Sequence, residues 1–340
     1  MNSEERIIQT LHRSETDRIP SFEWVIDRQV INAMRPGASE EGFIYQEDLD
    51  AVCVDLDYTR EEIEPGLFRD EWGRVTRHSA EAHPYPLRGP ISCMEELRRY
   101  EYPDPANPAR YASLERSLSG NAGKKAVILH LNDVFSLPSR LMKFEDFMMC
   151  IVLDPKLARA LVDLSVEANL AFAREARGRG VKIIYTGDDY AYNNGPMVSP
   201  AAFREIFFPG LKRVVAGYKE LGLLVIKHTD GDIMPIIDMI VDAGFDCLDP
   251  IDPVAGMDLE TVKERFGNRI AIKGNVDCAN LLTFGSPEEV RRAAEYCILT
   301  GGRGGGYIFS SSNSIHSSVK PENYRAMLDT WIELRERRAG

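Results

Sequence analysis

The sequence contains no stretch that approaches the ~18 consecutive apolar residues of a membrane-spanning helix. Its first 18 residues also lack the apolar core of a signal peptide, because they are charged and have the spacing of an amphipathic helix, with Ile7, Ile8 and Leu11 on one face. The six cysteines form no CxxC motif and no close pair, as is typical of a reduced protein. We therefore expect a cytoplasmic protein that is neither secreted nor embedded in a membrane.

Positive charge is also scarce. The 41 lysines and arginines are outnumbered by 53 aspartates and glutamates, which gives a net charge of −12. The acidic residues are scattered along the chain rather than gathered in a tail. This balance argues against a nucleic-acid partner. An anionic substrate is still compatible with this charge, provided that specific basic side chains bind the anion in a local pocket.

Apolar residues, in contrast, are abundant enough for a large core. Hydrophobic residues make up 44% and charged residues 28% of the 340 residues, as is ordinary for a globular enzyme. A chain of this length suits either one α/β barrel with insertions or two domains of medium size.

Short β-branched runs alternate with helical patterns, an order typical of parallel strands joined by helices. Eight such runs can be identified, at residues 21–25, 51–54, 126–131, 182–185, 223–227, 247–248, 270–272 and 307–309. Helices are predicted at residues 154–178, 200–221, 233–243, 258–266, 286–300 and 321–338. Two of them begin with a serine cap followed by proline, which supports these boundaries. The sequence therefore predicts an α/β fold of the single (β/α)8 TIM-barrel type.

Residues 57–125 interrupt this alternation with seven prolines and a small hairpin predicted around residues 67–78. We interpret this segment as an elaborated loop after the second strand that covers the barrel mouth, within one domain spanning residues 1–340. A division into two domains near residue 120 is the alternative. The glycine run at residues 301–306 precedes the last strand at the opposite end of the barrel, and we interpret it as a tight turn rather than a phosphate-binding loop.

Polar residues gather directly after five of the predicted strands. Residues just past the carboxyl end of a barrel strand point into the mouth, so these clusters are expected to meet there. We predict that they form one active site, although Asp and Asn are also ordinary turn residues. The clusters lie at residues 132–133, 186–195, 228–232, 273–278 and 310–317.

Four of these residues are predicted to be catalytic. Asp188 and Asp189 are adjacent carboxylates, and one of them can have its pKa raised toward neutrality and exchange protons, while the alternative role for either is to cap the next helix. His228 and Asp230 are two residues apart on an extended segment, which points both to the same side. That arrangement suits a pair of metal ligands or a His-carboxylate relay, and a hydrogen-bonded histidine within the mouth is the alternative.

Further residues extend this site. Cys278 and Glu205 can complete His228 and Asp230 into a zinc site, although a buried inert thiol is the other interpretation of Cys278. The remaining polar residues of the mouth are predicted to bind substrate, and they are Asp133, Tyr192, Asn194, Asn275, Asp277, Asn313 and His316.

Four motifs resemble the uroporphyrinogen decarboxylase superfamily, and the resemblance extends over nearly the whole chain. They are the acidic-Trp-Gly turn at residues 70–75, the loop and helix at residues 187–209, the Gly-Asn-Val-Asp run at 274–277 with residues 281–290, and the ending at 306–309 with residues 320–324. The resemblance implies a (β/α)8 barrel. It also implies one of two activities, namely decarboxylation of uroporphyrinogen without a cofactor or methyl transfer that involves a corrinoid protein, often with zinc.

True decarboxylases of this superfamily resemble one another in an N-terminal run whose arginines receive the carboxylate-rich tetrapyrrole. Here the corresponding residues 22–29 read Phe-Glu-Trp-Val-Ile-Asp-Arg-Gln, and only Arg28 stands as a counterpart. A substrate rich in carboxylates needs several cations in a partly dehydrated pocket, so this difference disfavours the decarboxylase activity. The resemblance makes Asp55 or Asp57 the counterpart of the aspartate that binds the pyrroles.

Zinc methyltransferases acting on coenzyme M resemble each other in a His-x-Cys after strand five and a Cys in the last loop. This chain has Asp230 and Asn313 at those places, which changes a soft thiolate site into a hard oxygen and nitrogen site. The leading hypothesis is a methyltransferase that moves a methyl group between a small substrate and a corrinoid supplied by a partner protein, with zinc. The alternatives are a decarboxylase acting on uroporphyrinogen or a smaller acid, with Asp188 or Asp189 handling protons, and a non-catalytic corrinoid- or tetrapyrrole-binding protein.

Overall fold

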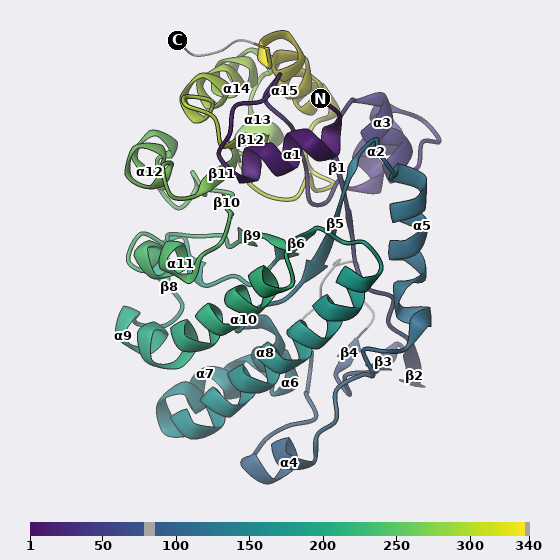
Figure 1. Ribbon diagram of the computed structural model, residues 1–340, viewed down its shortest axis with the longest axis vertical. Coiled ribbons are helices and arrows are strands. Elements are labelled where there is room, and N and C mark those ends of the chain that lie inside the picture. Colours follow the sequence, from purple (N-terminus) through teal and green to yellow (C-terminus); the bar gives the residue numbers. More distant parts are fainter. Residues whose placement is uncertain (78–85, 337–340) are drawn as a thin grey trace.

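Seven parallel strands form one curved sheet in a computed structural model, which describes residues 1–77 and 86–336. The strands follow each other in the sheet in the order β1-β5-β6-β9-β10-β11-β12, and helices alternate with them around the outside (Figure 1). Each strand is therefore joined to the next by a crossover on the same side, which is the arrangement of a TIM barrel. The predicted TIM-barrel-like α/β fold is confirmed. The strands are β1 (Ala51–Val54), β5 (Ala126–Leu131), β6 (Ile183–Thr186), β9 (Leu224–His228), β10 (Cys247–Asp249), β11 (Ala271–Val276) and β12 (Tyr307–Ser311).

The helices outside this sheet match the predicted ones closely. The predicted helix at residues 200–221 is continuous but contains a π-helical turn, Phe203–Phe207, between α9 and α10. Helices α8, α9 and α14 each begin with a serine or aspartate cap that is followed by proline at the first helical position. The crossover helices are α5 (Ala112–Asn121), α8 (Pro155–Gly178), α10 (Phe208–Glu220), α11 (Ile237–Ala243), α12 (Leu259–Phe266) and α14 (Pro287–Gly301). The others are α1 (Ser3–Leu11), α2 (Arg28–Met34), α3 (Glu40–Gln46), α4 (Met94–Arg99), the 3-10 helix Pro108–Tyr111, α6 (Ser136–Leu141), α7 (Phe144–Leu153), α9 (Pro200–Ala202), α13 (Leu281–Phe284) and α15 (Pro321–Leu334).

The predicted first strand, residues 21–25, closes the barrel without forming a regular strand. Ser21 makes an isolated parallel bridge to Phe309 of β12, and its carbonyl accepts a hydrogen bond of 2.7 Å from the amide of Asp50 at the start of β1. In a continued ladder the amide of Ser311 would bond to the backbone of this segment. It bonds instead to the carboxylate of Glu23 (3.0 Å), so the ladder stops and the strand prediction is corrected.

Alternation along the strands divides the core into two parts. Ala126 and Ile128 of β5 face the inside of the barrel with the small or branched residues of the other strands, while Val127 and Leu129 face the helices. Ile7 and Leu11 of α1 belong to the inner cluster, so α1 covers the amino end of the barrel. The barrel is therefore filled with side chains, and only its carboxyl end is left for a site.

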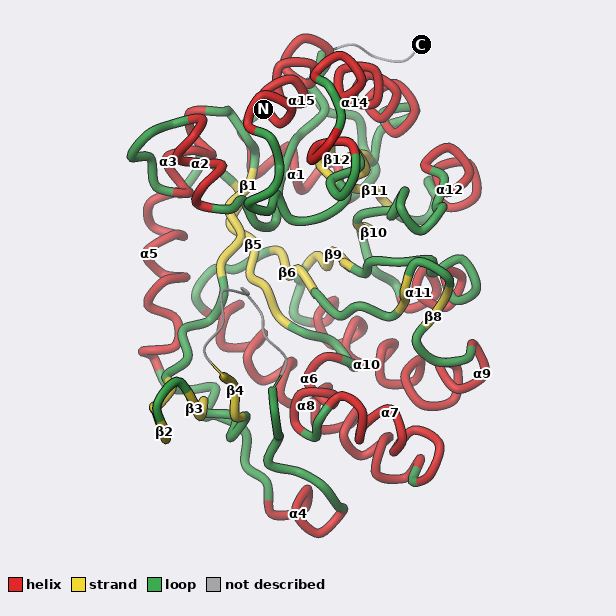
Figure 2. The backbone as a smooth tube through the Cα atoms, turned by 180° about the vertical axis from the view of Figure 1, so that it is seen from behind, coloured by secondary structure: helices red, strands yellow, loops and turns green. Residues whose placement is uncertain are grey.

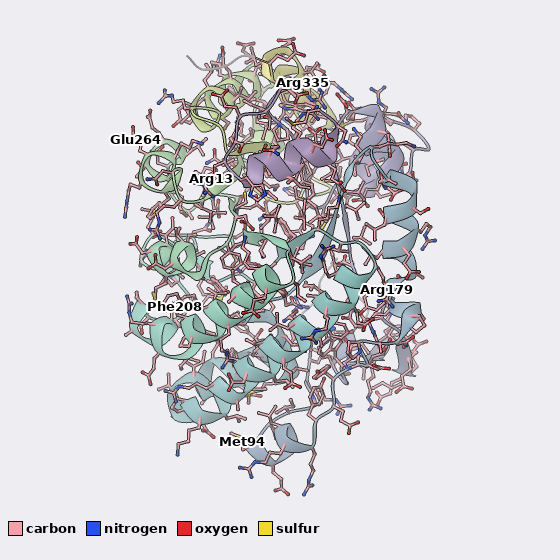
Figure 3. The ribbon with its side chains drawn as sticks, in the orientation of Figure 1. Arg13, Met94, Arg179, Phe208, Glu264 and Arg335 are labelled. Atoms are coloured by element: carbon pink, nitrogen blue, oxygen red, sulfur yellow. The ribbon has the colours of Figure 1, made fainter. Side chains whose placement is uncertain are left out.

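The segment after β1 forms a small antiparallel sheet of β2 (Arg60–Glu64), β3 (Leu67–Asp70) and β4 (Val75–Arg77), visible beside the barrel in Figure 2. The predicted hairpin corresponds to β3 and β4, and β2 was not predicted; residue 78, the predicted end of the hairpin, lies outside the described residues. Arg179, labelled in Figure 3, ties the end of α8 to α5 by pairing with Glu115 (3.0 Å). The assignment of residues 1–340 to one domain stays a prediction.

None of the helices in residues 1–77 and 86–336 has the length and apolar composition needed to span a bilayer.

Candidate functional site

A cavity of about 470 Å³ opens at the carboxyl ends of the strands. Its lining residues come from the ends of β1, β5, β6 and β9, from the loop after β12, from α6 and α8, from the segment that follows β1, and from Trp24 before α2. This is the end of the barrel at which the sequence analysis placed the polar clusters. The candidate site is built in this mouth.

Three side chains of the mouth direct their polar atoms at one another. His228 Nε2, at the end of β9, lies 3.6 Å from Asp189 Oδ1 and 3.5 Å from Asp230 Oδ1. One such atom from each residue lies within 4.8 Å of the other two. Asp189 Oδ1 also accepts a hydrogen bond of 3.0 Å from the Asp230 amide, and Asp230 Oδ2 accepts one of 2.6 Å from Asn313. The structure therefore brings together three of the four residues that were predicted to be catalytic.

A second layer of buried residues orients His228. Its Nδ1 lies 3.0 Å from Asp249 Oδ2, at the end of β10. Asp249 is held in turn by Lys273, whose Nζ donates to Oδ1 at 2.8 Å, and by the hydroxyl of Tyr185. Because Asp249 engages Nδ1, the other ring nitrogen of His228 is left facing Asp189 and Asp230.

The charge of His228 follows from these neighbours. Burial alone would lower its pKa, but Asp230, Asp249 and Asp189 favour the imidazolium and raise the pKa to about 9. Burial raises the pKa of Asp230 to about 7, against the opposing effect of His228. At neutral pH, His228 is therefore a cation among carboxyl groups, and a metal ion that binds Nε2 must displace its proton.

The donor set of this cluster fits a zinc ion. Asp230 Oδ1 is buried and has no hydrogen-bond partner among the described residues, and its 3.5 Å separation from His228 Nε2 is too long for a hydrogen bond. Two carboxylate oxygens and one imidazole nitrogen are ligands that zinc accepts, and catalytic zinc sites combine three protein ligands with one open position. Asp249 adds the outer carboxylate that ligating histidines usually have.

Two residues that were predicted as metal ligands lie elsewhere. Glu205 is on the π-helical turn, has a side chain that is 68% exposed, and pairs with Arg159 of α8. The thiol of Cys278 donates to the carbonyl of Ser314 (3.2 Å), and burial raises its pKa to about 12, which disfavours the thiolate that binds metal. The predicted ligand set is therefore corrected, because Asp189 joins His228 and Asp230 in place of Glu205 and Cys278.

Asp188, the fourth residue predicted to be catalytic, is buried beneath the mouth. Its Oδ2 accepts hydrogen bonds from the amides of Phe135 (2.7 Å) and Ser136 (2.8 Å), which begin α6. Its carbonyl accepts from Lys227 Nζ (2.6 Å), which also binds Asp133 Oδ2 at 2.7 Å. Burial and the charge of Asp133 raise the pKa of Asp188 to about 7, against Lys227. Asp188, predicted to be catalytic, and Asp133, predicted to bind substrate, do not line the cavity, and the contacts that the structure gives them are structural.

Asn313 is the predicted substrate-binding residue that the structure places in the cavity, where it contacts Asp230. Tyr192 and Asn194 belong to the short hairpin of β7 (Ala191–Tyr192) and β8 (Gly195–Pro196), and their exposed side chains do not line the cavity. The carbonyl of Tyr192 accepts a hydrogen bond from the amide of Asp232 (2.9 Å), so the hairpin supports the loop after β9 through its backbone.

Three other predicted substrate-binding residues have structural contacts outside the cavity. Asn275 is buried in β11 and donates to a backbone carbonyl of the loop after β10 (2.8 Å). Asp277 accepts a hydrogen bond from a backbone amide three residues later (2.9 Å), as turn aspartates do. His316 is exposed, and its Nδ1 accepts from a nearby backbone amide (3.3 Å). Their contacts, like those of Asp133 and Asp188, are structural.

The site also contains functional candidates that the sequence analysis missed. His130 and Tyr185 occupy inward positions within β5 and β6, and Asp249 is the last residue of β10, whereas the predicted clusters lay in the loops after the strands. Side chains along a strand alternate between the inside of the barrel and the helices, so a residue two positions after an inward residue also faces inward. This rule would have identified His130, two residues after Ile128, and Asp249, two residues after Cys247. The missed residues are Trp24, His130, Tyr185 and Asp249.

Glu23 is a buried carboxylic acid close to Lys273, and its effect on stability can be tested. Its carboxylate accepts hydrogen bonds from the amide (3.0 Å) and hydroxyl (2.7 Å) of Ser311, and burial raises its pKa to about 7 despite Lys273. An acid whose pKa is raised in the folded state contributes stability below its unfolded pKa and loses that contribution as the pH rises through the folded pKa. We expect Glu23→Gln to gain about 3 kcal/mol in free energy of unfolding relative to the wild type between pH 4.5 and pH 8.

Urea unfolding of both proteins at the two pH values measures this difference. The exposed Glu288→Gln variant is the control and should show no pH-dependent gain. A constant difference between Glu23→Gln and the wild type across this range would show that Glu23 is ionised throughout.

Comparisons with known proteins identify the family of this chain. Residues 75–334 match the sequence model of the uroporphyrinogen decarboxylase (URO-D) family. The chain belongs to this family. Uroporphyrinogen decarboxylase from Psychromonas ingrahamii is 22% identical over 269 residues, which cover 73% of this chain and 71% of that relative. A methylated-thiol–coenzyme M methyltransferase from Methanosarcina mazei is 26% identical over 179 residues, which cover 53% of this chain and 46% of that relative.

A solved structure of a methyltransferase from Methanosarcina mazei has the same fold, with a TM-score of 0.73 over 98% of this chain and 99% of that chain, at 18% identity. The chain spans about half the length of the Methanosarcina coenzyme M methyltransferase and of the Neisseria gonorrhoeae decarboxylase that it matches. Family membership therefore leaves the choice between decarboxylation and methyl transfer open.

The family resemblance pointed to Arg28, Asp55 and Asp57 as counterparts of decarboxylase residues, and the three lie in different surroundings. Arg28 is exposed on α2, donates to the carbonyl of Ala38 (2.6 Å) and does not line the cavity. Asp55 lines the cavity and lies 2.6 Å from His130 Nδ1. Asp57 accepts hydrogen bonds from the amide and hydroxyl of Ser113, in the first turn of α5. Asp55 is therefore the one of the two aspartates that can contact a bound molecule.

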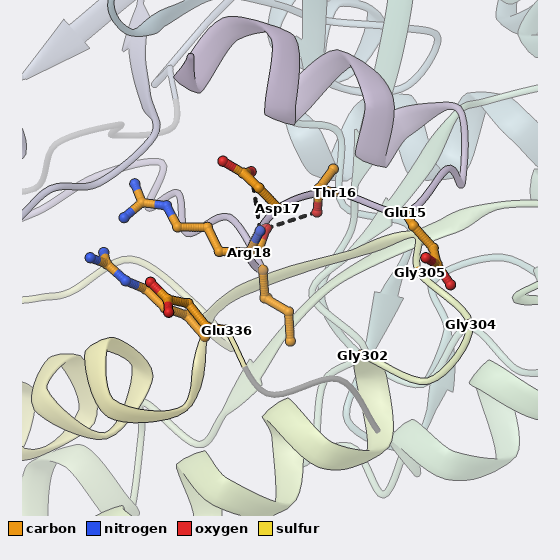
Figure 4. Close-up of a pocket in the computed structure, with 10 residues that line it drawn as sticks. Glu15, Thr16, Asp17, Arg18, Gly302, Gly304, Gly305 and Glu336 are labelled. Atoms are coloured by element: carbon orange, nitrogen blue, oxygen red, sulfur yellow. Dashed lines mark hydrogen bonds between the residues drawn. The ribbon is translucent and has the colours of Figure 1, made fainter. Parts of the chain in front are cut away.

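Figure 4 shows a smaller hollow of about 70 Å³ at the opposite end of the barrel. The predicted tight turn of residues 301–306 borders it, with Gly304 (φ 68°) and Gly305 (φ 77°) in the left-handed region that favours glycine. Glu15 and Asp17 also line this hollow. Arg18, Arg335 and Glu336 line it as well, so its rim carries charges of both signs.

Proposed function

We propose that this URO-D family member is a methyltransferase that moves a methyl group between a small substrate and a corrinoid carried by a partner protein. The observation that carries the proposal is the cluster of Asp189, His228 and Asp230 in the mouth, with Asp249 behind the histidine. A relative whose name is that of a methyltransferase supports it. We also place the protein in the cytoplasm, because its six cysteines are free thiols.

In such a transfer, the bond between the methyl carbon and the substrate's heteroatom breaks with its electron pair left on that heteroatom. The same displacement would form the bond from the methyl carbon to the corrinoid that the partner protein carries. Asp189, His228 and Asp230 would hold a zinc ion, which would supply Lewis acidity to the departing heteroatom. The contribution of the chain itself is orientation, because Asp249 fixes the ring of His228 and Asn313 fixes Asp230.

The charges of the cavity argue against uroporphyrinogen as the substrate. Among the described residues that line it, the arginines are Arg74 and Arg140, and the acids are Asp55, Asp189 and Asp230. A carboxylate-rich tetrapyrrole in this cavity would meet a comparable number of fixed negative and positive groups. The desolvation of its carboxylates would then be poorly compensated.

The test combines metal content with methyl transfer. The purified wild-type chain is expected to hold close to one zinc per chain by mass spectrometry after dialysis against zinc, and to convert reduced cobalamin to methylcobalamin with methylated small molecules as donors. Asp230→Asn should reduce both, and Glu205→Gln should reduce neither. Formation of coproporphyrinogen from uroporphyrinogen would overturn the proposal in favour of decarboxylation. Tight corrinoid or tetrapyrrole binding without turnover would favour a binding protein.

A further inference from the structure

A second cavity, of about 510 Å³, lies at the amino end of the barrel. It is formed by α12, by the last turn of α14 and by the turns that follow these two helices and lead into β11 and β12. None of its lining residues belongs to the mouth cavity, so it is separate from the site of the proposed methyl transfer. The lining residues are Glu260, Lys263, Glu264, Gly267, Asn268, Thr300, Arg303 and Gly304.

Lys263 of α12 folds back along the end of its own helix instead of extending into solvent. A methyl group placed on Gly267 would lie 2.9 Å from Cδ of Lys263, so the lysine stem covers the glycine backbone directly. The Nζ atom donates to the carbonyl of Gly305 at 2.5 Å, across the turn that precedes β12. This bond uses one of the three N–H groups of the ammonium ion and holds the half-buried amine beside the cavity.

The ammonium ion of Lys263 forms no ion pair with a carboxylate in residues 1–77 and 86–336. Glu260, on the same helix, pairs instead with Arg303 at 2.9 Å. Glu264 is exposed on the outer side of α12, where Figure 3 labels it. Burial lowers the pKa of Lys263 to about 8, against the opposing effect of the buried Cys247 thiol in β10. A substantial fraction of Lys263 is therefore a neutral amine at neutral pH.

The surroundings of the other lysines differ from this arrangement. Lys156, in the first turn of α8, is exposed to solvent, where the ammonium ion is well hydrated. An ammonium ion has no free electron pair, so a lysine is a nucleophile only after it loses its proton. Lys263 thus combines a neutral amine with an adjoining space that a small molecule can enter. The lysines that pair with carboxylates are Lys125, Lys143, Lys182, Lys219, Lys227 and Lys273.

We infer that Lys263 is a modification site that takes an acyl group from a small activated donor, either an acyl phosphate or an acyl thioester. The Lys263 nitrogen attacks the carbonyl carbon of the donor and forms a carbon–nitrogen bond. The bond from that carbon to the phosphate oxygen or the thioester sulfur breaks, with its electron pair left on the departing group, and the nitrogen releases a proton to solvent. The product is an amide whose remaining N–H can still donate to Gly305. A cavity of this volume accommodates donors of that size.

Peptide mass spectrometry of the wild-type chain, incubated with acetyl phosphate or separately with acetyl coenzyme A, tests this inference by measuring the rate at each lysine. At pH 7.5 we expect Lys263 to be acetylated about tenfold faster than Lys156 by at least one donor, because a lysine with a pKa of about 8 is neutral far more often than an ordinary lysine. The advantage should shrink between pH 7.5 and pH 10, as exposed amines also lose their protons.

A variant of the cavity lining tests whether these surroundings cause the reactivity. Asn268→Asp places a carboxylate beside the cavity, which favours the ammonium ion and should slow acetylation of Lys263 several-fold at pH 7.5. The rate at Lys156 should not change. The matched control is Gln29→Glu, which adds the same charge at an exposed position of α2 outside the cavity. Thermal unfolding verifies that both variants are folded.

Two results would overturn the inference. One is acetylation of Lys263 no faster than that of Lys156 at pH 7.5 with both donors. The other is equal slowing of Lys263 by Asn268→Asp and Gln29→Glu, which would mean that net charge rather than the cavity controls the rate. Selective acetylation by one donor alone would support the inference and identify the source of the acyl group.

Discussion

The Lys227→Met variant is expected to lose about 3–5 kcal/mol in free energy of unfolding. Lys227 is fully buried, and its ammonium group binds Asp133 Oδ2 at 2.7 Å and the carbonyl of Asp188 at 2.6 Å. The hydroxyl of Tyr190 also donates to Asp133. Removing the cation leaves the Asp133 carboxylate buried without a counter-charge, a state that costs more than the loss of a surface ion pair. Chemical unfolding followed by circular dichroism measures the loss.

Two comparisons make this result specific. Lys182→Met removes a lysine whose pair with Glu4 is largely solvent-exposed, so its cost should be below about 1 kcal/mol. Adding Asp133→Asn to Lys227→Met removes the uncompensated charge and should restore part of the stability. A cost of less than about 1 kcal/mol for Lys227→Met, or no recovery in the double variant, would mean that the buried pair does not stabilise the loops after β5 and β6.

The second large effect is expected for metal binding by the Asp249→Asn variant, which should bind zinc about 10–100-fold more weakly than the wild type. Asp249 touches the cluster at His228, whose Nδ1 lies 3.0 Å from Asp249 Oδ2. The oxygen of the amide can still accept a hydrogen bond from Nδ1, but it lacks the negative charge that supports the basicity of the imidazole. His228→Asn removes the nitrogen ligand itself and should cause a larger loss. Competition of zinc with a chromophoric chelator gives the affinities.

The controls for metal binding are the two residues that the sequence alone placed in the zinc site. Glu205→Gln and Cys278→Ser should leave zinc affinity unchanged, because Glu205 pairs with Arg159 and the thiol of Cys278 donates to Ser314. In the wild type the affinity should rise with pH up to about 9, because zinc replaces the proton of His228. An unchanged affinity in Asp249→Asn, or a loss in Glu205→Gln, would contradict the site described above.

The fold could be predicted because its signals are local. Period-two runs of β-branched residues, serine and proline caps and the alternation of strands with helices each involve neighbours in the chain. The segment at residues 21–25 was the exception among the strands. Its pattern is that of a strand, but the carboxylate of Glu23 accepts a hydrogen bond from the amide of Ser311, almost three hundred residues away in the sequence. This contact interrupts the backbone ladder with β12.

The candidate site could be predicted only in part. The rule that polar residues after barrel strands face the mouth found Asp189, His228 and Asp230 correctly as neighbours. The same rule failed for Asp188, because adjacent residues on an extended chain point in opposite directions and only one of the pair can face the cavity. It also overlooked Asp249, which directly follows the short predicted strand at residues 247–248 and is the last residue of β10 in the structure.

The sequence by itself determined a barrel of parallel strands whose carboxyl ends carry a histidine among carboxylates, because these features depend on the order and period of residues along the chain. Only the tertiary structure decided which of these groups meet. The distance between His228 and Asp189, and the approach of Asp249 and Lys273 from other strands, depend on the register and curvature of the closed sheet. A contact between strands far apart in the chain is set by that packing, and no local pattern records it.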